Sequence, residues 1–300
     1  MIDIPEVFAH ETISREGEPG RAWIAALPRL ADELLQRWSC TPDGPIMHGN
    51  VGIVLPVRHL DLPPAVVKIS FPHLGNVFEP DAFAAWNGRG AVRLFARDDE
   101  RFAMLLERTA RGTLAEVSDF DEAVGILGRL SHRLAVDAPA GLPRLSDVVA
   151  DWTDEICTTA VELGDPLPRR VLDAAVETLR DLGPDQPQTL VHGDLHDANV
   201  LAGEREPWLA IDPKGYVGDP AYDAITVIRS YRFAPVLFAP DPAAGIRRGL
   251  DLYCEAAEID RDRARGWAQV RAVKAALWGR RHGDPDWLIR ATDQLAGILL

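Results

Sequence analysis

Cysteine is scarce in this chain of 300 residues. Its three cysteines, Cys40, Cys157 and Cys254, lie far apart and show no metal-ligand spacing. An odd and sparse set argues against a disulfide framework, and proteins without one are typical of reducing compartments. The fold must therefore be held by an apolar core, which the 47% hydrophobic content can supply.

Long apolar runs and an excess of basic residues are also missing. No run approaches the ~20 apolar residues of a membrane span. The first residues, MIDIPEVFAHE, have acids and a proline where a signal peptide needs a basic region and an apolar core. Lys and Arg number 32 against 46 Asp and Glu, a net charge of −14, which disfavours nucleic acid as a partner. We therefore expect a cytoplasmic protein without a membrane partner. The acidic balance suits a cationic small substrate and equally suits solubility alone.

The hydrophobic pattern of the first hundred residues indicates a small β-rich lobe. Leucines that recur every three to four residues after Pro28 predict a helix with proline at its first turn. Short apolar runs predict strands, and a helical pattern that stops at Asn87-Gly88 predicts a second helix. The predicted segments are a helix at 28–38, strands at 53–57, 65–70 and 102–107, and a helix at 79–86.

From Phe120 onward the pattern becomes helical, with apolar residues at intervals of three to four. The predicted helices cover 120–134, 171–182, 222–233, 246–258, 262–281 and 285–299, and short strands cover 189–191, 199–201 and 208–211. We place the lobe boundary just after the apolar run that ends at Glu107, which divides the chain into an N-lobe of residues 1–108 and a C-lobe of residues 109–300. The expected fold class is α+β, with a β-rich N-lobe and a mainly helical C-lobe.

The most informative segment is 190-LVHGDLHDANVLAGEREPWLAIDP-213. Phosphoryl transfer from ATP needs one carboxylate that orients a hydroxyl and accepts its proton, and Asp194 is the candidate for this role. It also needs oxygen ligands for Mg²⁺, which Asn199 and Asp212 would supply. Each of these residues alone could be a turn or cap residue, but their combination and order favour a catalytic and metal site. His192 is expected to brace the loop by hydrogen-bonding to backbone.

The turn Gly218-Asp219-Pro220, followed by Asp223, comes after this segment. It is typical of a helix entry with Asp219 as the cap, so we expect a structural role.

The N-lobe offers candidates for holding ATP. Lys68 lies inside the apolar run AVVKI, where a lysine is costly to bury unless it meets an opposite charge. Glu79 at the start of the next predicted helix is its expected partner, with Asp81 as the rival. Gly49 and Asn50 belong to a Gly-Asn-Val-Gly turn that either cradles phosphate with its backbone amides or is a plain turn.

The chain resembles the aminoglycoside/hydroxyurea phosphotransferase family, which includes streptomycin 6-phosphotransferases. The resemblance runs nearly end to end through GRAWIAALPRL, VLPVRHLDLPPAVVKIS, AFAAWNGRGAVRLF, AMLLER, VHGDLHDANVL and REPWLAIDPKGYVGDPAYD. It implies a bilobal protein-kinase-like fold and transfer of the γ-phosphate of ATP to a small molecule with Mg²⁺.

The resemblance also implies roles for single residues. Asp194 would be the catalytic aspartate, Asn199 and Asp212 would be the metal ligands, and Lys68 would hold ATP phosphates with Glu79 as its partner. Glu107 would lie in the segment whose backbone meets adenine. The chain departs from the family pattern before Glu79, where Phe78 stands in place of the histidine that relatives often have.

We therefore expect an ATP-dependent O-phosphotransferase acting on a small hydroxylated, cationic compound such as an aminoglycoside of the streptomycin type, and working as a monomer or weak dimer. The alternatives are a kinase for hydroxyurea or for a metabolic sugar or amino alcohol, and a nucleotide-binding module without turnover. A protein kinase is disfavoured because no activation segment closed by Ala-Pro-Glu follows Asp212.

Overall fold

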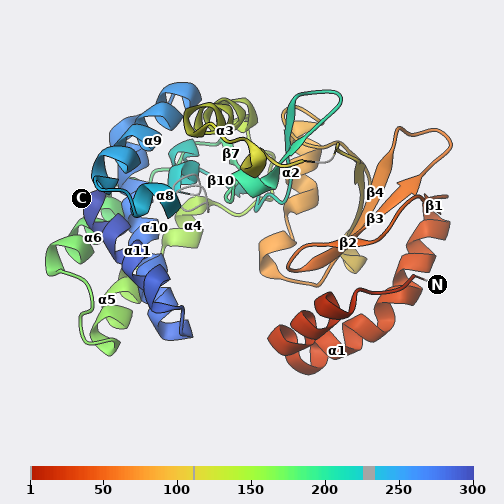
Figure 1. Cartoon of the computed structure of the whole chain (residues 1–300), viewed down its shortest axis with the longest axis horizontal. Coiled ribbons are helices and arrows are strands. Elements are labelled where there is room, and N and C mark those ends of the chain that lie inside the picture. Colours follow the sequence, from red (N-terminus) through yellow and green to blue (C-terminus); the bar gives the residue numbers. More distant parts are fainter. Residues whose placement is uncertain (1, 111, 226–233) are drawn as a thin grey trace. The chain divides into compact units, whose positions relative to one another are not determined.

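The computed structural model describes residues 2–110, 112–225 and 234–300. The chain forms two compact units, Met1–Ala110 and Arg111–Leu300, shown in Figure 1. None of the helices in the described ranges is both long and apolar enough to cross a membrane.

The first unit is built on an antiparallel sheet with strand order β1-β3-β4-β6-β5, and β2 pairs with β3. The strands are β1 (Thr41–Pro42), β2 (Met47–His48), β3 (Gly52–Arg58), β4 (Ala65–Ser70), β5 (Leu94–Asp98) and β6 (Ala103–Glu107). The predicted strands at 53–57 and 65–70 are confirmed. The third predicted strand starts one residue later than expected because Phe102, with a φ of 50°, caps the short helix η2 (Asp99–Arg101).

Strand β5 was not predicted. It lies at the edge of the sheet, its first four residues are only half-buried, and its register against β6 shifts between Leu94 and Ala96. An edge strand with an irregular register gives no clean alternation of apolar and polar residues. The helix predicted at 79–86 is α2 (Glu79–Trp86), which ends at Asn87 in the left-handed conformation.

The predicted start of the first helix is wrong. Helix α1 spans Glu6–Arg37, with a kink at Gly17, so Pro28 lies inside the helix and not at its first turn. Phe8, Leu27 and Leu34 are almost completely buried in one core cluster with strands β3, β4 and β6. Burial of these apolar side chains favours the longer helix although proline removes one backbone donor.

The second unit is mainly helical. Its helices are α3 (Phe120–Leu134), α4 (Leu145–Val149), α5 (Trp152–Glu162), α6 (Arg169–Leu182), α8 (Ala234–Leu237), α9 (Pro242–Ala257), α10 (Arg261–His282) and α11 (Asp286–Ile298). The predictions at 120–134, 171–182, 246–258, 262–281 and 285–299 are confirmed, whereas α4 and α5 were missed. Of the helix predicted at 222–233, residues 226–233 lie outside the described residues.

Helix α10 organises this unit. It contacts α6 on one side and α11 on another, and α3 packs closely against α9 (Figure 1). Trp267 of α10 and Tyr253 of α9 are completely buried.

Two short antiparallel strand pairs carry the predicted catalytic segment. Strand β7 (Leu190–Val191) pairs with β10 (Tyr216–Val217), and β8 (Val200–Ala202) pairs with β9 (Trp208–Ala210). Between β7 and β8 the chain forms the one-turn helix η4 (Asp197–Asn199), and after β10 it forms η5 (Pro220–Asp223). This arrangement brings residues 192–199 and 211–216 together.

Candidate active site

The loop that carries Asp194 begins at Gly193, which has a φ of 85°. A Cβ atom at this position would lie 2.9 Å from Cβ of Lys214 and 2.9 Å from Cδ2 of Tyr216. Glycine is therefore required twice, by the left-handed backbone and by the close approach of the second segment. The loop is pressed against residues 214–216 as it leaves β7.

His192 connects the two halves of the predicted site. Its Nδ1 accepts a hydrogen bond from the backbone N–H of Asp194 at 3.2 Å, and its Nε2 lies 3.0 Å from the carbonyl oxygen of Ile211. Burial lowers the pKa of His192 to about 4, so the ring is neutral near pH 7. A neutral imidazole has one acceptor and one donor. Because Nδ1 accepts, Nε2 carries the proton and donates to Ile211. The predicted bracing role of His192 is confirmed.

Asn199 joins the same frame through its amide. Its side-chain Nδ2 donates to the backbone carbonyl oxygen of Asp194 at 3.0 Å. Its backbone carbonyl oxygen accepts from the backbone N–H of Ile211 at 2.9 Å. Since the amide nitrogen is committed to the loop, Oδ1 is the atom that a cation would meet. The residue is 9% exposed, whereas Asp194 is half-buried.

Asp212 has an unusual backbone conformation. Its φ is 58°, and proline follows it. Residues other than glycine rarely adopt this left-handed region, and a proline at the next position restricts the backbone further. Such a conformation costs roughly 1–3 kcal/mol and persists where the surroundings impose it, often at functional sites. Here the hydrogen bonds at Ile211 and at Lys214, whose N–H donates to the carbonyl oxygen of His192 at 2.7 Å, hold both sides of Asp212.

Asn199 and Asp212 fit a hard cation that keeps most of its other ligands as water or phosphate. They offer one neutral and one charged oxygen, which suits Mg²⁺ held through few protein ligands. In the described ranges no group of three or more His, Cys, Asp or Glu side chains forms a cation cage.

Asp223 makes a contact with this site that the sequence did not predict. A structural role was expected for it, and its buried carboxylate has one, since it accepts the backbone N–H of Gly193 at 2.9 Å, thirty residues away in the sequence. Burial raises the pKa of Asp223 to about 7, while the positive charge of Arg271 opposes this. No local pattern signals that this side chain reaches back to the Asp194 loop. Asp219, by contrast, caps η5 as predicted, through Ala221 N at 3.0 Å.

We expect the Asp223→Asn variant to gain stability over wild type as the pH rises. The carboxyl titrates near 4 when unfolded and near 7 when folded. Between these values the folded state binds more protons, so this group makes the wild type less stable as pH rises, by up to ~1.4 kcal/mol per pKa unit. The Asp223→Asn variant has no carboxyl group at this position and therefore does not lose this stability. Urea unfolding of both proteins from pH 5 to pH 8 should give diverging stabilities that level off above pH 7; parallel curves would contradict the assignment.

An aromatic–cation wall, formed by Tyr216, Arg271, Trp152 and Lys274, begins beside the Asp194 loop. The ring of Tyr216 lies against Gly193 and makes an edge contact with the ring of Tyr222 at a centroid distance of 6.1 Å. Cζ of Arg271 lies 4.4 Å from the centre of the Tyr222 ring.

The wall continues away from the loop. The Trp152 and Tyr222 ring centres are 6.3 Å apart, and Nζ of Lys274 lies 4.3 Å from the centre of the Trp152 ring. Lys274 also forms an ion pair with Glu155, which is exposed. All four side chains of the wall are half-buried, so each presents part of its surface to solvent.

In the first unit, Nζ of Lys68 lies 2.6 Å from Oε1 of Glu79, and both residues are buried. The predicted pairing is present. The rival Asp81 binds Arg97 instead, at 2.7 Å. Strand β4 directs Lys68 toward the start of α2, and the departure from the family pattern at Phe78 does not disturb this contact.

The other two predicted ATP-binding positions lie at opposite ends of the sheet. Gly49 and Asn50 are exposed in the turn between β2 and β3, which is closed by a hydrogen bond from Gly49 N to the carbonyl oxygen of Gly52 at 3.0 Å. Glu107 ends β6, and its backbone N–H donates to the carbonyl oxygen of Arg93 at 2.8 Å. Nothing in these contacts tests a nucleotide-binding role, which stays a prediction.

The family model and the related proteins found by comparison indicate the same family of kinases. A family model described as aminoglycoside/hydroxyurea antibiotic resistance kinase matches residues 37–283. Streptomycin 6-kinase of Streptomyces glaucescens is 40% identical over 285 residues, covering 94% of this chain and 92% of that protein. Hydroxyurea phosphotransferase of Kitasatospora aureofaciens is 35% identical over 288 residues, covering 95% of this chain and 82% of that protein.

Solved structures agree on the fold. The crystal structure of macrolide 2′-phosphotransferase from Brachybacterium faecium matches with a TM-score of 0.55 and 17% identity, covering 91% of this chain and 98% of that chain. Likeness at this identity establishes the fold alone. The predicted α+β, protein-kinase-like fold class is confirmed.

Proposed function

Because the chain belongs to the aminoglycoside/hydroxyurea antibiotic resistance kinase family, we propose that it transfers the γ-phosphate of ATP to a hydroxyl of a streptomycin-type aminoglycoside. The observation that carries this proposal is the hydrogen-bonded frame of residues 192–199 and 211–214. It ties the Asp194 loop and Asn199 to Ile211 and Lys214, which lie on either side of Asp212. Cytoplasmic location and a monomeric or weakly dimeric state belong to the same proposal.

In the proposed reaction, Asp194 accepts a hydrogen bond from the acceptor hydroxyl and takes its proton as the new oxygen–phosphorus bond forms. The bond between the γ-phosphorus and the bridging oxygen breaks, and ADP leaves with the electron pair. Asn199 and Asp212 would hold Mg²⁺, which neutralises the phosphate charge when bound. The protein supplies mainly orientation, because phosphoryl transfer requires little covalent chemistry from side chains.

The first unit is proposed to hold ATP. Lys68, kept in place by Glu79, would contact phosphate oxygens, and the amides at Gly49 and Asn50 would cover them. The backbone at Glu107 would meet adenine. The buried ion pair supports this assignment, since an ammonium fixed by a carboxylate is oriented before the ligand arrives.

The aromatic–cation wall is proposed to bind the acceptor. Ring faces of Tyr216 and Trp152 suit the apolar faces of sugar-like rings, and Arg271 and Lys274 offer donors to ring hydroxyls. Asp194 would provide negative charge for cationic groups of the acceptor, whereas the carboxylate of Glu155 is already paired with Lys274. A wall of this length favours an acceptor of several rings. Hydroxyurea, the substrate in the name of one relative, would touch only the part beside Asp194.

A panel of acceptors tests the proposal. Magnesium-dependent release of ADP from ATP would be measured with streptomycin, other aminoglycosides, hydroxyurea, simple sugars and amino alcohols. We expect the rate of ADP release to be highest with streptomycin and to fall to background when a chelator removes Mg²⁺. A Trp152→Ala variant should raise KM for streptomycin several-fold with little change in KM for ATP. Preference for hydroxyurea would favour the alternative of a hydroxyurea kinase. ATP binding without ADP release for any acceptor would indicate a binding module without turnover.

A further inference from the structure

A small cavity lies within the first unit, beside Glu79 of the Lys68–Glu79 ion pair. Its volume is about 190 Å³. It is lined by the start of α2, the end of β4, the end of β5 and the start of β6, and it is partly open to solvent. Of the residues proposed for ATP binding, Glu79 alone is in its lining. The cavity is therefore distinct from the turn at Gly49 and Asn50 and from the backbone at Glu107.

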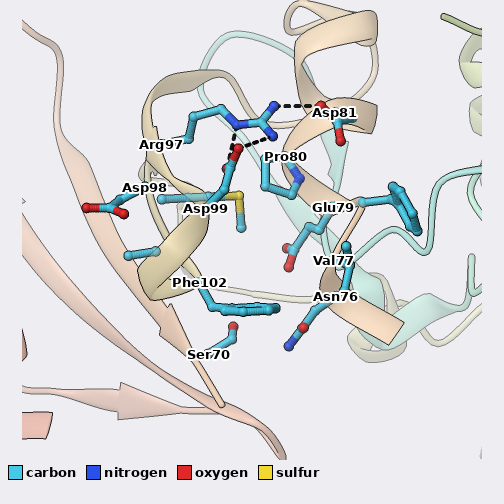
Figure 2. A pocket seen from close by; sticks show the side chains of 13 residues that line it. Ser70, Asn76, Val77, Glu79, Pro80, Asp81, Arg97, Asp98, Asp99 and Phe102 are labelled. Atoms are coloured by element: carbon cyan, nitrogen blue, oxygen red, sulfur yellow. Dashed lines mark hydrogen bonds and ion pairs between the residues drawn. The ribbon is translucent and has the colours of Figure 1, made fainter. Parts of the chain in front are cut away.

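Ser70 gives this cavity an unsatisfied polar group. The side chain is 2% exposed, and its hydroxyl has no hydrogen-bond partner among the residues that the structure describes. Figure 2 shows the hydroxyl of Ser70, the ring of Phe102 and the carboxylate of Glu79 turned toward the same space. Buried hydroxyls are normally hydrogen-bonded, so one that faces a cavity calls for an explanation such as a ligand or ordered water.

The volume of the cavity limits what can occupy it. Pockets for drug-sized ligands and cofactors have volumes of roughly 300–1,000 Å³, so neither a nucleotide nor an aminoglycoside fits. A cavity of about 150 Å³ in another protein holds a benzene molecule. The cavity in this unit therefore suits a molecule with one six-membered ring and a small substituent.

The charged groups of the lining already have protein partners. Glu79 binds Lys68, Asp98 binds Arg37 and Arg101, and Arg97 binds Asp81 and Asp99 (Figure 2 draws the last two). A charged occupant would disturb these pairs. The other polar side chains of the lining are Ser70 and Asn76, and the amide of Asn76 is already bonded to His73 and Phe71. Val77, Phe102 and Met104 are among the apolar residues that complete the lining.

We propose that this cavity is a regulatory site for a neutral single-ring molecule that carries one hydroxyl group. The ring packs between Phe102 and Met104, and the hydroxyl pairs with Oγ of Ser70. Because Glu79 lines the cavity and also holds Lys68, the occupant stabilises the start of α2 and the orientation of the ammonium. Binding at the two places is then coupled, and each ligand changes the affinity of the other by the same factor.

Calorimetric titration of the full chain with phenol, and with toluene as an apolar analogue of the same shape, tests the site. We expect phenol to bind about five-fold more tightly than toluene, the gain of one hydrogen bond. The Ser70→Ala variant should lose this preference. The Thr12→Val variant is the matched control, because Thr12 has another buried hydroxyl without a described partner, in α1 and outside this lining. It should keep the wild-type preference.

Three outcomes would overturn the proposal. The first is no saturable binding, which would mean that the cavity holds water only. The second is an equal preference for phenol in wild type and Ser70→Ala, or NMR shift changes on binding that miss Ser70 and Phe102. The third is phenol binding that leaves ATP affinity unchanged, which would remove the regulatory role. This last measurement rests on the proposed ATP site, but the phenol–toluene comparison does not, so the two proposals can fail separately.

Discussion

Replacing Asp194 with alanine is expected to lower kcat by on the order of 10³-fold, since a positioned general base contributes about 10²–10⁴-fold. The fold should survive. The hydrogen bonds that hold the loop use the backbone of Asp194, whose N–H donates to His192 and whose carbonyl oxygen accepts from Asn199. These bonds remain in the variant. ADP release from ATP with the best acceptor of the panel is the measurement.

The Asp194→Asn variant is the matched control for shape. It keeps the size of the side chain but removes the negative charge and most of its capacity to take a proton. We expect nearly the same loss of kcat as with alanine, together with ATP affinity and unfolding midpoints close to wild type in both variants. Turnover within ten-fold of wild type would mean that another group accepts the proton.

The local arrangement of the candidate catalytic segment could be predicted from the sequence because its residues lie close together in the chain. Asp194 and Asn199 lie within one loop, and Asp212 follows the short β8–β9 hairpin that comes next, so residue types and spacing carry most of the information. The role of His192 as a brace could be predicted for the same reason, because its partners lie two and nineteen residues away.

Features that depend on distant contacts could not be predicted. Asp223 contacts Gly193, which lies thirty residues away in the sequence. The residues next to Asp223 in the sequence have the pattern of an ordinary turn before a helix. Helix α1 extends upstream of Pro28 because Phe8 and Leu27 are buried against the sheet, which no local pattern reveals. The left-handed backbone of Asp212 comes from hydrogen bonds on both sides of it, against the preference of the residue itself.

The Lys68→Ala variant is expected to lose stability as well as activity. It leaves the carboxylate of Glu79, which is 2% exposed, without the ammonium 2.6 Å away. Breaking a buried ion pair by removing one partner costs about 3–5 kcal/mol. Urea unfolding measures this loss. Asp81→Ala is the matched control, because Asp81 also ties α2 to the sheet, through Arg97, but its side chain is 41% exposed. An exposed pair contributes about 0–1 kcal/mol, so equal losses in the two variants would contradict this account.

A double variant, Lys68→Met with Glu79→Met, separates the two roles of the pair. Replacing a buried ion pair by apolar side chains of similar volume is often neutral or stabilising, so stability should return to near the wild-type value. Nucleotide affinity and turnover should not return, because the ammonium is absent. If the Lys68→Ala variant is destabilised and the double variant is as stable as wild type but inactive, the pair is retained for ATP binding and not for folding. Recovery of turnover together with stability would instead show that Lys68 has no role in the reaction.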